Sequence, residues 1–206
     1  MNNDKFSNKL LVEGNDDLHV IKAICQKANI SQNFDIKDCN GIDNLFEQVP
    51  VWFKSSTVHT VGIVIDADID FEQTIDRLKT LIQKLGFNIP EVFSNQGAIL
   101  QKDNRSLGVW IMPNNQGKGM LEDFMTLLVP DDDMLMPIVE QVLTDIESKQ
   151  LQKYLPAHRP KAQIHTWLSW QSNPGTPMGL AITKNYFSTH QQIGKYFVEW
   201  LTTLYK

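Results

Sequence analysis

The sequence predicts an α/β fold in which helices flank a largely parallel sheet and a helical part follows towards the C-terminal end. Short apolar runs alternate with helix-like stripes over the first half of the 206-residue chain, whereas almost every signal after Leu121 is helical. The length fits one domain with an extension, because single hydrophobic cores usually span roughly 100–200 residues.

The first half of the chain contains three apolar runs that predict strands and three stripes that predict helices. The strands are expected at residues 10–12, 34–36 and 61–65, the last a continuous apolar run typical of a buried parallel strand. The helices are expected at residues 18–28, with Asp16 as the cap, at 41–53, where Pro50 is expected to disturb the helix, and at 75–85, which Gly86 ends. This βαβαβα order predicts parallel strands joined by crossover helices.

The second half begins with two short strands and then becomes helical. Strands are expected at residues 99–100 and 109–112, as a hairpin or as two closing strands around a polar turn at 102–106. Helices are expected at residues 122–128, 136–151, 162–170 and 193–204. We therefore divide the chain into an α/β domain, residues 1–130, and a helical C-terminal extension packed on it, residues 131–206.

Composition and charge narrow the classes of function. The formal net charge of -5 argues against sequence-independent coating of DNA, which needs a broad Lys/Arg surface, but an acidic site that holds a metal can still accept a phosphodiester. The apolar runs are too short to span a bilayer and residues 1–8 are too polar for a signal peptide, so we expect a cytoplasmic protein that does not enter the membrane. Cys25 and Cys39 match neither a disulfide framework nor a zinc motif.

Acidic side chains directly follow two of the predicted strands, as EGNDD at residues 13–17 and DADID at residues 66–70. Ligands of parallel α/β sheets bind at the carboxyl ends of the strands. Glu13 and Asp17 are one helical turn apart, and Asp66 and Asp68 point the same way if the extended geometry continues. Because hard divalent cations prefer several carboxylate oxygens, these four acids form a candidate site for Mg²⁺ or Mn²⁺.

The order of these motifs, EG after one apolar strand and DxD after a later one, resembles the Toprim fold of topoisomerases, primases and nucleases of the overcoming-lysogenization-defect (OLD) family. The resemblance implies a Rossmann-like sheet. An acid four residues after the glutamate, as Asp17 follows Glu13, is most similar to the OLD-type nucleases. Together with PNNQGKGMLEDF (residues 113–124) and KAQIHTWLSWQSNPGTPMGLAI (residues 161–182), the arrangement is also similar to an uncharacterised family of small stand-alone Toprim-like proteins.

The resemblance to OLD-type nucleases implies a site and a reaction. The metal ligands it implies are Glu13, Asp17, Asp66, Asp68 and a downstream glutamate, for which Glu122 is the candidate. It also implies a catalytic lysine near the scissile phosphate, with Lys161 as first candidate and Lys118 and Lys184 as alternatives. The implied reaction is metal-dependent hydrolysis of nucleic acid phosphodiesters, in antiviral defence or DNA repair. OLD proteins also carry an ATPase domain, so energy coupling here would require a separate ATPase or effector protein. An oligomer is compatible with the sequence.

Three alternative functions share parts of this pattern. Asp16, Asp17, Asp66 and Lys118 imitate a phosphoacceptor signalling domain, an interpretation that leaves Asp68 without a role. Haloacid-dehalogenase-type phosphatases also place DxD after an apolar strand, but Asp70 stands where these enzymes usually carry Thr or Val. A catalytically silent Toprim fold that serves as an interaction module is the third alternative.

Two conspicuous groups of residues have ordinary structural explanations. The acids at residues 131–133 follow Pro130 and are expected to cap a helix. Trp167, Trp170 and Trp200 lie at helical spacings and are expected in the core.

Overall fold

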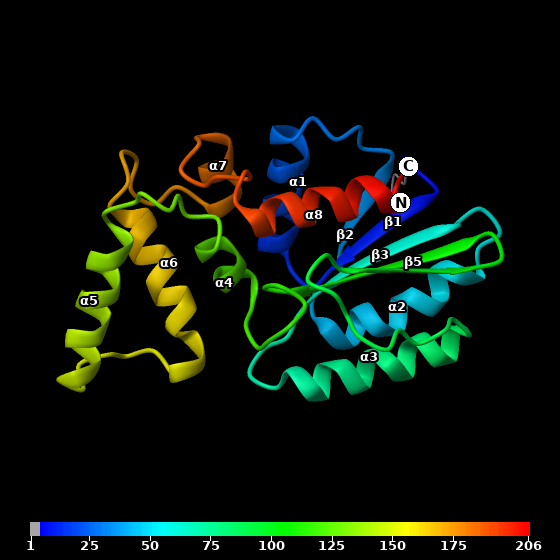
Figure 1. The fold of residues 1–206 in the computed structure, drawn as a ribbon, viewed down its shortest axis with the longest axis horizontal. Helices are drawn as coiled ribbons and strands as arrows, with labels where there is room; N and C mark the ends of the chain where they lie inside the picture. Colours follow the sequence, from blue (N-terminus) through cyan, green and yellow to red (C-terminus); the bar gives the residue numbers. More distant parts are fainter. Residues whose placement is uncertain (1–4) are drawn as a thin grey trace.

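The computed structural model describes residues 5–206, which form one five-stranded sheet with helices on both faces (Figure 1). The strands are β1 (Asn8–Val12), β2 (Phe34–Asp38), β3 (Thr60–Asp66), β4 (Ala98–Lys102) and β5 (Arg105–Met112). Their order across the sheet is β2-β1-β3-β5-β4. The first four strands of that order are parallel, and β4 is antiparallel to β5. The predicted fold class, a largely parallel Rossmann-like sheet flanked by helices, is confirmed.

Helices follow or connect nearly every strand. They are α1 (Asn15–Lys27), α2 (Ile42–Lys54), α3 (Phe71–Leu85), α4 (Leu121–Thr126), α5 (Met136–Ser148), the short 3-10 helix η1 (Pro156–His158), α6 (Arg159–Ser169), α7 (Met178–Thr183) and α8 (Gln192–Leu204). Within the described residues, none of these helices combines the length and the apolar character that a membrane crossing requires.

Alternating side chains of the central strands divide the core between the two faces of the sheet. Leu10 and Val12 of β1 belong to a buried cluster formed with α1, α4, α6, α7 and α8. Leu11, between them, belongs to a second cluster formed with α2 and α3. This period of two is the normal geometry of a strand that is covered on both faces. Figure 1 shows α2 and α3 beneath the sheet and α1 and α8 on its other side.

Two facing glycines bring helix α8 close to the centre of the sheet. Gly62 of β3 and Gly108 of β5 are register partners. A Cβ atom at Gly62 would lie 2.5 Å from the Tyr205 hydroxyl, and one at Gly108 would overlap the Leu204 side chain. The last helix therefore contributes to the core of the α/β domain, and the boundary at residues 130 and 131 stays a prediction.

Helices α5 and α6 form a hairpin that projects away from the sheet (Figure 1). Arg159 joins the two helices, because its guanidinium contacts Glu140 at 2.8 Å and Glu147 at 3.0 Å. The Tyr154 hydroxyl donates to Glu147 at 2.7 Å. Helix α6 also packs on α4. This packing brings the first turn of α6 next to the carboxyl edge of the sheet.

Two expectations about local structure are wrong. Pro50 does not interrupt α2, which runs from Ile42 to Lys54 and is anchored by its buried face of Leu45, Val49 and Phe53. Tertiary packing of that face outweighs the one backbone hydrogen bond that proline removes. Trp170 is 41% exposed because α6 ends at Ser169, before the tryptophan can turn towards the core. Helix α7 lies outside the predicted helices.

Two other expectations are confirmed. Trp167 and Trp200 are buried in the core. The Asp133 carboxylate accepts the backbone N–H groups of Leu135 and Met136 at 3.0 and 2.7 Å, so it satisfies donors at the start of α5.

Candidate metal centre

The acidic residues that follow β1 and β3 meet at the carboxyl edge of the parallel sheet. Val12 and Val64 are register partners, so Glu13 and Asp66 leave neighbouring strands at similar heights. Asp66 in turn faces Met112, the last residue of β5. The loop after β5 leads into α4, which carries Glu122 in its first turn. Three adjacent strands therefore place acids at one edge.

Glu13 links the ends of β1 and β3. Its Oε1 accepts the backbone N–H of Asp66 at 2.6 Å. Burial raises the pKa of Glu13 to about 7; the Asp66 N–H lowers it, and the charges of Asp17 and Asp68 raise it further. The raised pKa therefore reflects burial first, with the neighbouring carboxylates adding to it.

Asp17 lies beside Glu13 in the first turn of α1. The helix begins at Asn15 with Gly14 as N-cap, so the expectation that Asp16 caps the helix is wrong. Asp17, three residues after the cap, instead accepts the Gly14 N–H at 3.1 Å. Asp17 is 8% exposed. Burial raises its pKa to about 7, and the charge of Glu122 contributes in the same direction.

Asp66 is the most strongly perturbed acid of the group. Burial raises its pKa well above the ordinary value, and the nearby charges of Asp17 and Glu13 raise it further. Its Oδ1 is buried and has no hydrogen-bond partner among the described residues. An oxygen in this position fits a cation, because a buried anionic oxygen without a donor is otherwise costly.

Asp68 does not continue the extended geometry of β3. Its φ of 53° turns the backbone into the left-handed region, so the expectation of a straight DxD segment is wrong. The turn is held by a pair of backbone hydrogen bonds, both 2.8 Å, between Asp68 and Gly119. Asp68 is exposed, yet its charge still raises the pKa values of Glu13 and Asp66. It therefore lies at the rim of the site.

Glu122 and Lys161 close the site from the helical side. Glu122 is 3% exposed, and its Oε1 lies 2.5 Å from Lys161 Nζ. Its Oε2 is buried and lacks a partner among the described residues. Partial burial lowers the pKa of Lys161, but Glu122 and the charges of Asp66 and Asp16 outweigh that effect, so the pKa is raised.

The three lysine candidates differ in position. Lys118 lies in the loop before α4, and Lys184 is the C-cap of α7. Within residues 5–206, Lys161 is the one of the three that forms an ion pair with a predicted ligand.

The carboxylates form one electrostatic cluster but are not arranged for coordination as they stand. Within residues 5–206, no group of three or more His, Cys, Asp or Glu side chains is set to hold a metal ion. The cause is visible in the hydrogen bonds, because Glu13 is turned to Asp66 N–H, Asp17 to Gly14 N–H and Glu122 to Lys161. Coordination would require these side chains to exchange their present donors for the ion. The donor set, hard oxygens with two unpartnered buried atoms, fits Mg²⁺ or Mn²⁺.

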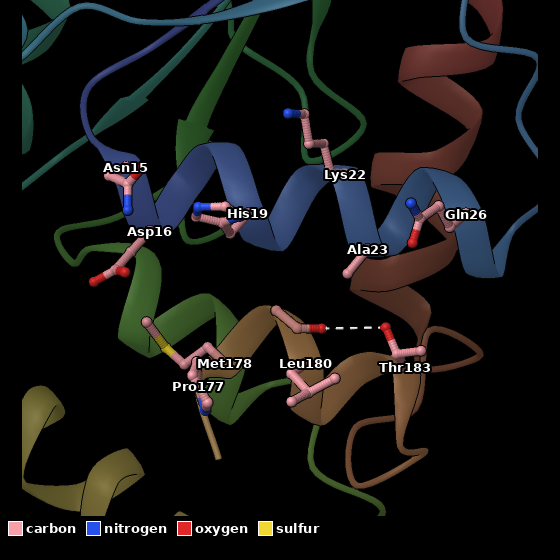
Figure 2. Close-up of a pocket in the computed structure, with 11 residues that line it drawn as sticks. Asn15, Asp16, His19, Lys22, Ala23, Gln26, Pro177, Met178, Leu180 and Thr183 are labelled. Carbon is pink, nitrogen blue, oxygen red and sulfur yellow. Dashed lines mark hydrogen bonds between the residues drawn. The ribbon is translucent and has the colours of Figure 1, made fainter. Parts of the chain in front are cut away.

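A groove between α1 and α7 opens beside this cluster. Figure 2 shows Asp16 on the side of α1 that faces Pro177 and Met178, and His19 further along the same helix. The cavity volume is about 560 Å³. The two helices approach closely because Gly179 has no side chain: a Cβ atom there would lie 2.8 Å from the His19 carbonyl oxygen. The groove gives solvent a path along the first turn of α1.

Two residues at this edge have no clear signal in the sequence. Arg77 of α3 forms an ion pair with Asp43 at 2.5 Å, and its charge lowers the pKa of Glu13. Asn115 follows β5 and accepts the Ile111 N–H at 2.7 Å through its side-chain oxygen. Asn115 has a φ of 64°, a conformation that asparagine adopts more readily than most residues.

Comparison with known proteins gives a family and three solved structures. Structures of the C-terminal region of the Xanthomonas campestris pv. campestris OLD protein, phased with mercury, iodine and platinum, match with TM-scores of 0.41, 0.43 and 0.42 and sequence identities of 12%, 13% and 13%. The matches cover 97%, 97% and 96% of this chain and 86%, 85% and 83% of the solved chains. No curated protein matches. A family model described as "Protein of unknown function (DUF3226)" matches residues 7–206.

Proposed function

The chain belongs to the DUF3226 family, whose description assigns no activity, and from the site itself we propose a Toprim-type nuclease that hydrolyses phosphodiester bonds of nucleic acid with Mg²⁺ or Mn²⁺. One observation carries the proposal. Four buried or half-buried carboxylates, Glu13, Asp17, Asp66 and Glu122, converge at the carboxyl edge of the sheet with two buried oxygens that have no partner among the described residues. Like charges gathered in this way destabilise the fold unless a cation or protons neutralise them.

The residues of the site have two roles in this proposal. Some bind the metal ion, and two others act on the substrate, one as a base and one as a positive charge. Asp66 and Glu122 hold the unpartnered oxygens and are the first ligands, and Glu13 and Asp17 join them when they release their backbone donors. When bound, Mg²⁺ or Mn²⁺ supplies a lowered pKa for bound water and charge stabilisation for the phosphate oxygens.

Asp68 and Lys161 face the place where a phosphate would enter. Asp68 is exposed at the rim, where its carboxylate can accept a proton from water. The Lys161 side chain is 48% exposed, and its ammonium can donate to a non-bridging phosphate oxygen when it leaves Glu122. A phosphodiester approaches this acidic edge through the bound cations, which reverse the local charge.

Cleavage assays with single-stranded DNA, plasmid DNA and RNA in Mg²⁺, Mn²⁺ or EDTA test the proposal. We expect cleavage that requires a divalent cation and falls by about 10²–10³-fold in Asp66→Asn, a loss of the size seen when one electrostatic group is removed from an active site. Asp66→Asn keeps the shape of the side chain and removes repulsion, so folding is retained. Asp132→Asn, at an exposed acid that is not among the proposed ligands, is the matched control.

Calorimetry with Mn²⁺ separates this function from a silent interaction module. We expect heat of binding that Asp66→Asn reduces and Asp132→Asn leaves unchanged. A protein that binds no Mn²⁺ and cleaves none of the substrates contradicts the proposal. Cleavage that is undiminished in Asp66→Asn contradicts the assigned site.

A further inference from the structure

Arg77 of α3 reaches the acidic edge by way of the first turn of α2. Its guanidinium donates to Asp43, in that first turn, at 2.5 Å. Gly41, the N-cap of α2, donates its backbone N–H to the Glu13 carbonyl at 2.8 Å. The positive charge of Arg77 is close enough to Glu13 to lower the pKa of that carboxyl group. Arg77 therefore belongs to the surroundings of the candidate metal centre.

Arg77 and Lys161 flank the acidic cluster from opposite faces of the sheet. Helix α3 covers one face together with α2, whereas α6 packs on the other face with α1 and α4. Lys161 in α6 is paired with Glu122, as Arg77 is paired with Asp43. Each cation is thus held beside the site by one carboxylate. A chain of phosphates that crosses the edge from one face to the other passes both.

The pair between Arg77 and Asp43 is one that a phosphate can replace at little cost. The Arg77 side chain is 39% exposed and that of Asp43 is 85% exposed. An ion pair between exposed side chains is worth at most about 1 kcal/mol, and Asp43 stays hydrated when its partner leaves. Arg77 is therefore accessible to a substrate, unlike the cation of a buried ion pair.

Open space beside the guanidinium lets it change partners. Arg77 and Lys84 line a cavity of about 520 Å³ between α2 and α3, together with Asp43 and Glu47, so the charges of the cavity itself balance. The attraction for a phosphate therefore comes from the guanidinium and from the cation-loaded edge of the sheet. The guanidinium also lies 4.9 Å from the centre of the Phe46 ring. This contact keeps it near α2 while its N–H groups turn from one anion to another.

We propose that Arg77 binds a backbone phosphate next to the scissile one, on the side of the metal centre opposite Lys161. The inference rests on the proposed nuclease function and adds a binding site for the sugar-phosphate backbone of the substrate. In this complex the guanidinium leaves Asp43 and donates two parallel N–H groups to the phosphate, a geometry that its planar fork fits and that lysine cannot reproduce. Because phosphates carry no base identity, the contact strengthens the binding of every sequence equally.

Fluorescence anisotropy with labelled oligothymidylate, at several salt concentrations, tests this inference on the full chain. Ca²⁺ fills the acidic site during the titration, and gel analysis confirms that the oligonucleotide remains intact. We expect Arg77→Met to bind about tenfold more weakly, the value of one charge-assisted contact. The slope of log affinity against log salt should also become shallower by about 0.7, because one phosphate contact of a single strand is lost.

Asp43→Asn provides the opposite change and protects the test against misfolding of Arg77→Met. It removes the acid that competes with the phosphate, so we expect binding up to about fivefold tighter than in the wild type. Arg77→Lys keeps the charge without the fork, so its affinity should lie between those of the wild type and Arg77→Met. Lys79→Met and Asp76→Asn are the matched controls and should bind like the wild type. They change an exposed pair of the same helix, 3.9 Å apart, that lies outside the cavity.

The outcomes separate this inference from the proposed function. Unchanged affinity and salt dependence in Arg77→Met overturn the inference, as does weaker binding in Asp43→Asn, while metal-dependent cleavage by the wild type still supports the nuclease. Opposite shifts in the two variants, with both controls unchanged, support the phosphate site even if no cleavage occurs, and in that case the catalytic proposal alone fails. Where cleavage occurs, Arg77→Met should raise KM and leave kcat nearly unchanged, because the contact forms before the reaction and is kept during it.

Discussion

Strand β1 has an ionisable side chain at each end, the buried Lys9 near its start and the half-buried Glu13 just after its last residue. Lys9 is 2% exposed, but its ammonium contacts Asp35 at 2.7 Å and lies 5.0 Å from the centre of the Trp52 ring. Asp35 is its register partner on β2. Glu13, in contrast, lies near the carboxylates of Asp17 and Asp68, and its pKa is raised to about 7.

The difference between the two ends shows which buried charges serve the fold. At the Lys9 end an opposite charge on Asp35 and the Phe6 carbonyl accept hydrogen bonds from the ammonium, so the buried charge is neutralised. At the Glu13 end the neighbours repel one another, and oxygens of Asp66 and Glu122 stay unpartnered. A fold retains such repulsion when a ligand relieves it, which is the reason to seek function at the second end.

The largest expected effect on stability is at the Lys9 end. Lys9→Met keeps the apolar stem and removes the opposite charge from Asp35, which keeps the N–H groups of Lys5 and Phe6, so we expect a loss of about 3 kcal/mol in the free energy of unfolding. Urea denaturation measures the change. Lys195→Met, at an exposed lysine of α8, is the control and should change stability little. An equal, small effect of both substitutions would contradict the structural role of the buried pair.

The two ends should respond to pH in opposite directions. Burial and like charges raise the pKa values of Glu13 and Asp17 to about 7. The protonated side chains therefore stabilise the fold fully below their unfolded pKa values of 4.5 and 3.8. This stabilisation is lost as the pH rises through about 7. Burial alone would raise the pKa of Asp35, but Lys9 and the N–H groups of Phe6 and Lys5 lower it. The contribution of Asp35 is therefore present above its unfolded pKa and lost as pH falls.

Thermal melts in EDTA test this opposition. Because a tenfold change in proton affinity is worth roughly 1.4 kcal/mol, we expect the metal-free protein to lose on the order of 3 kcal/mol between about pH 5 and pH 8. Mn²⁺ should restore the lost stability at the higher pH, and Asp66→Asn should make the loss smaller. A melting temperature that is the same at both pH values in EDTA, and that Mn²⁺ in place of EDTA does not raise, would show that the carboxylates of the cluster do not destabilise the fold.

A smaller effect is expected where the acidic end does have a positive partner. Lys161 occupies Glu122 Oε1, so a metal ion must compete with its ammonium. Lys161→Met removes that competition, and since a half-exposed ion pair is worth at most about 1 kcal/mol, we expect Mn²⁺ to bind up to about fivefold more tightly. Calorimetry against Lys195→Met measures the difference. Weaker binding in Lys161→Met would mean that the lysine supports the metal instead of competing with it.

The two ends also differ in how far the sequence predicts them. The acids of the functional end follow apolar strands directly, so parallel topology alone brings Glu13 and Asp66 together. The backbone turn at Asp68 was not predictable, because it depends on its pairing with Gly119 far along the chain. The burial of Lys9 is not visible in the sequence, because strand register determines its contact with Asp35 and the packing of α2 determines its contact with Trp52. Long-range register is not contained in local patterns.

The smallest expected effect on the free energy of unfolding concerns the contact that joins the C-terminal residues to the Lys9 end. The Tyr205 hydroxyl donates to the Lys9 carbonyl at 2.8 Å, and its ring stacks on Phe34 with the centroids 3.9 Å apart. Tyr205→Phe keeps the stacking and removes the donor, so we expect a loss of about 1–2 kcal/mol in the free energy of unfolding. Mn²⁺ affinity should not change, because the acidic cluster lies at the other end of β1. A loss of Mn²⁺ binding without a loss of stability would show that the two ends are coupled through the strand, and that the paired end is part of the functional site.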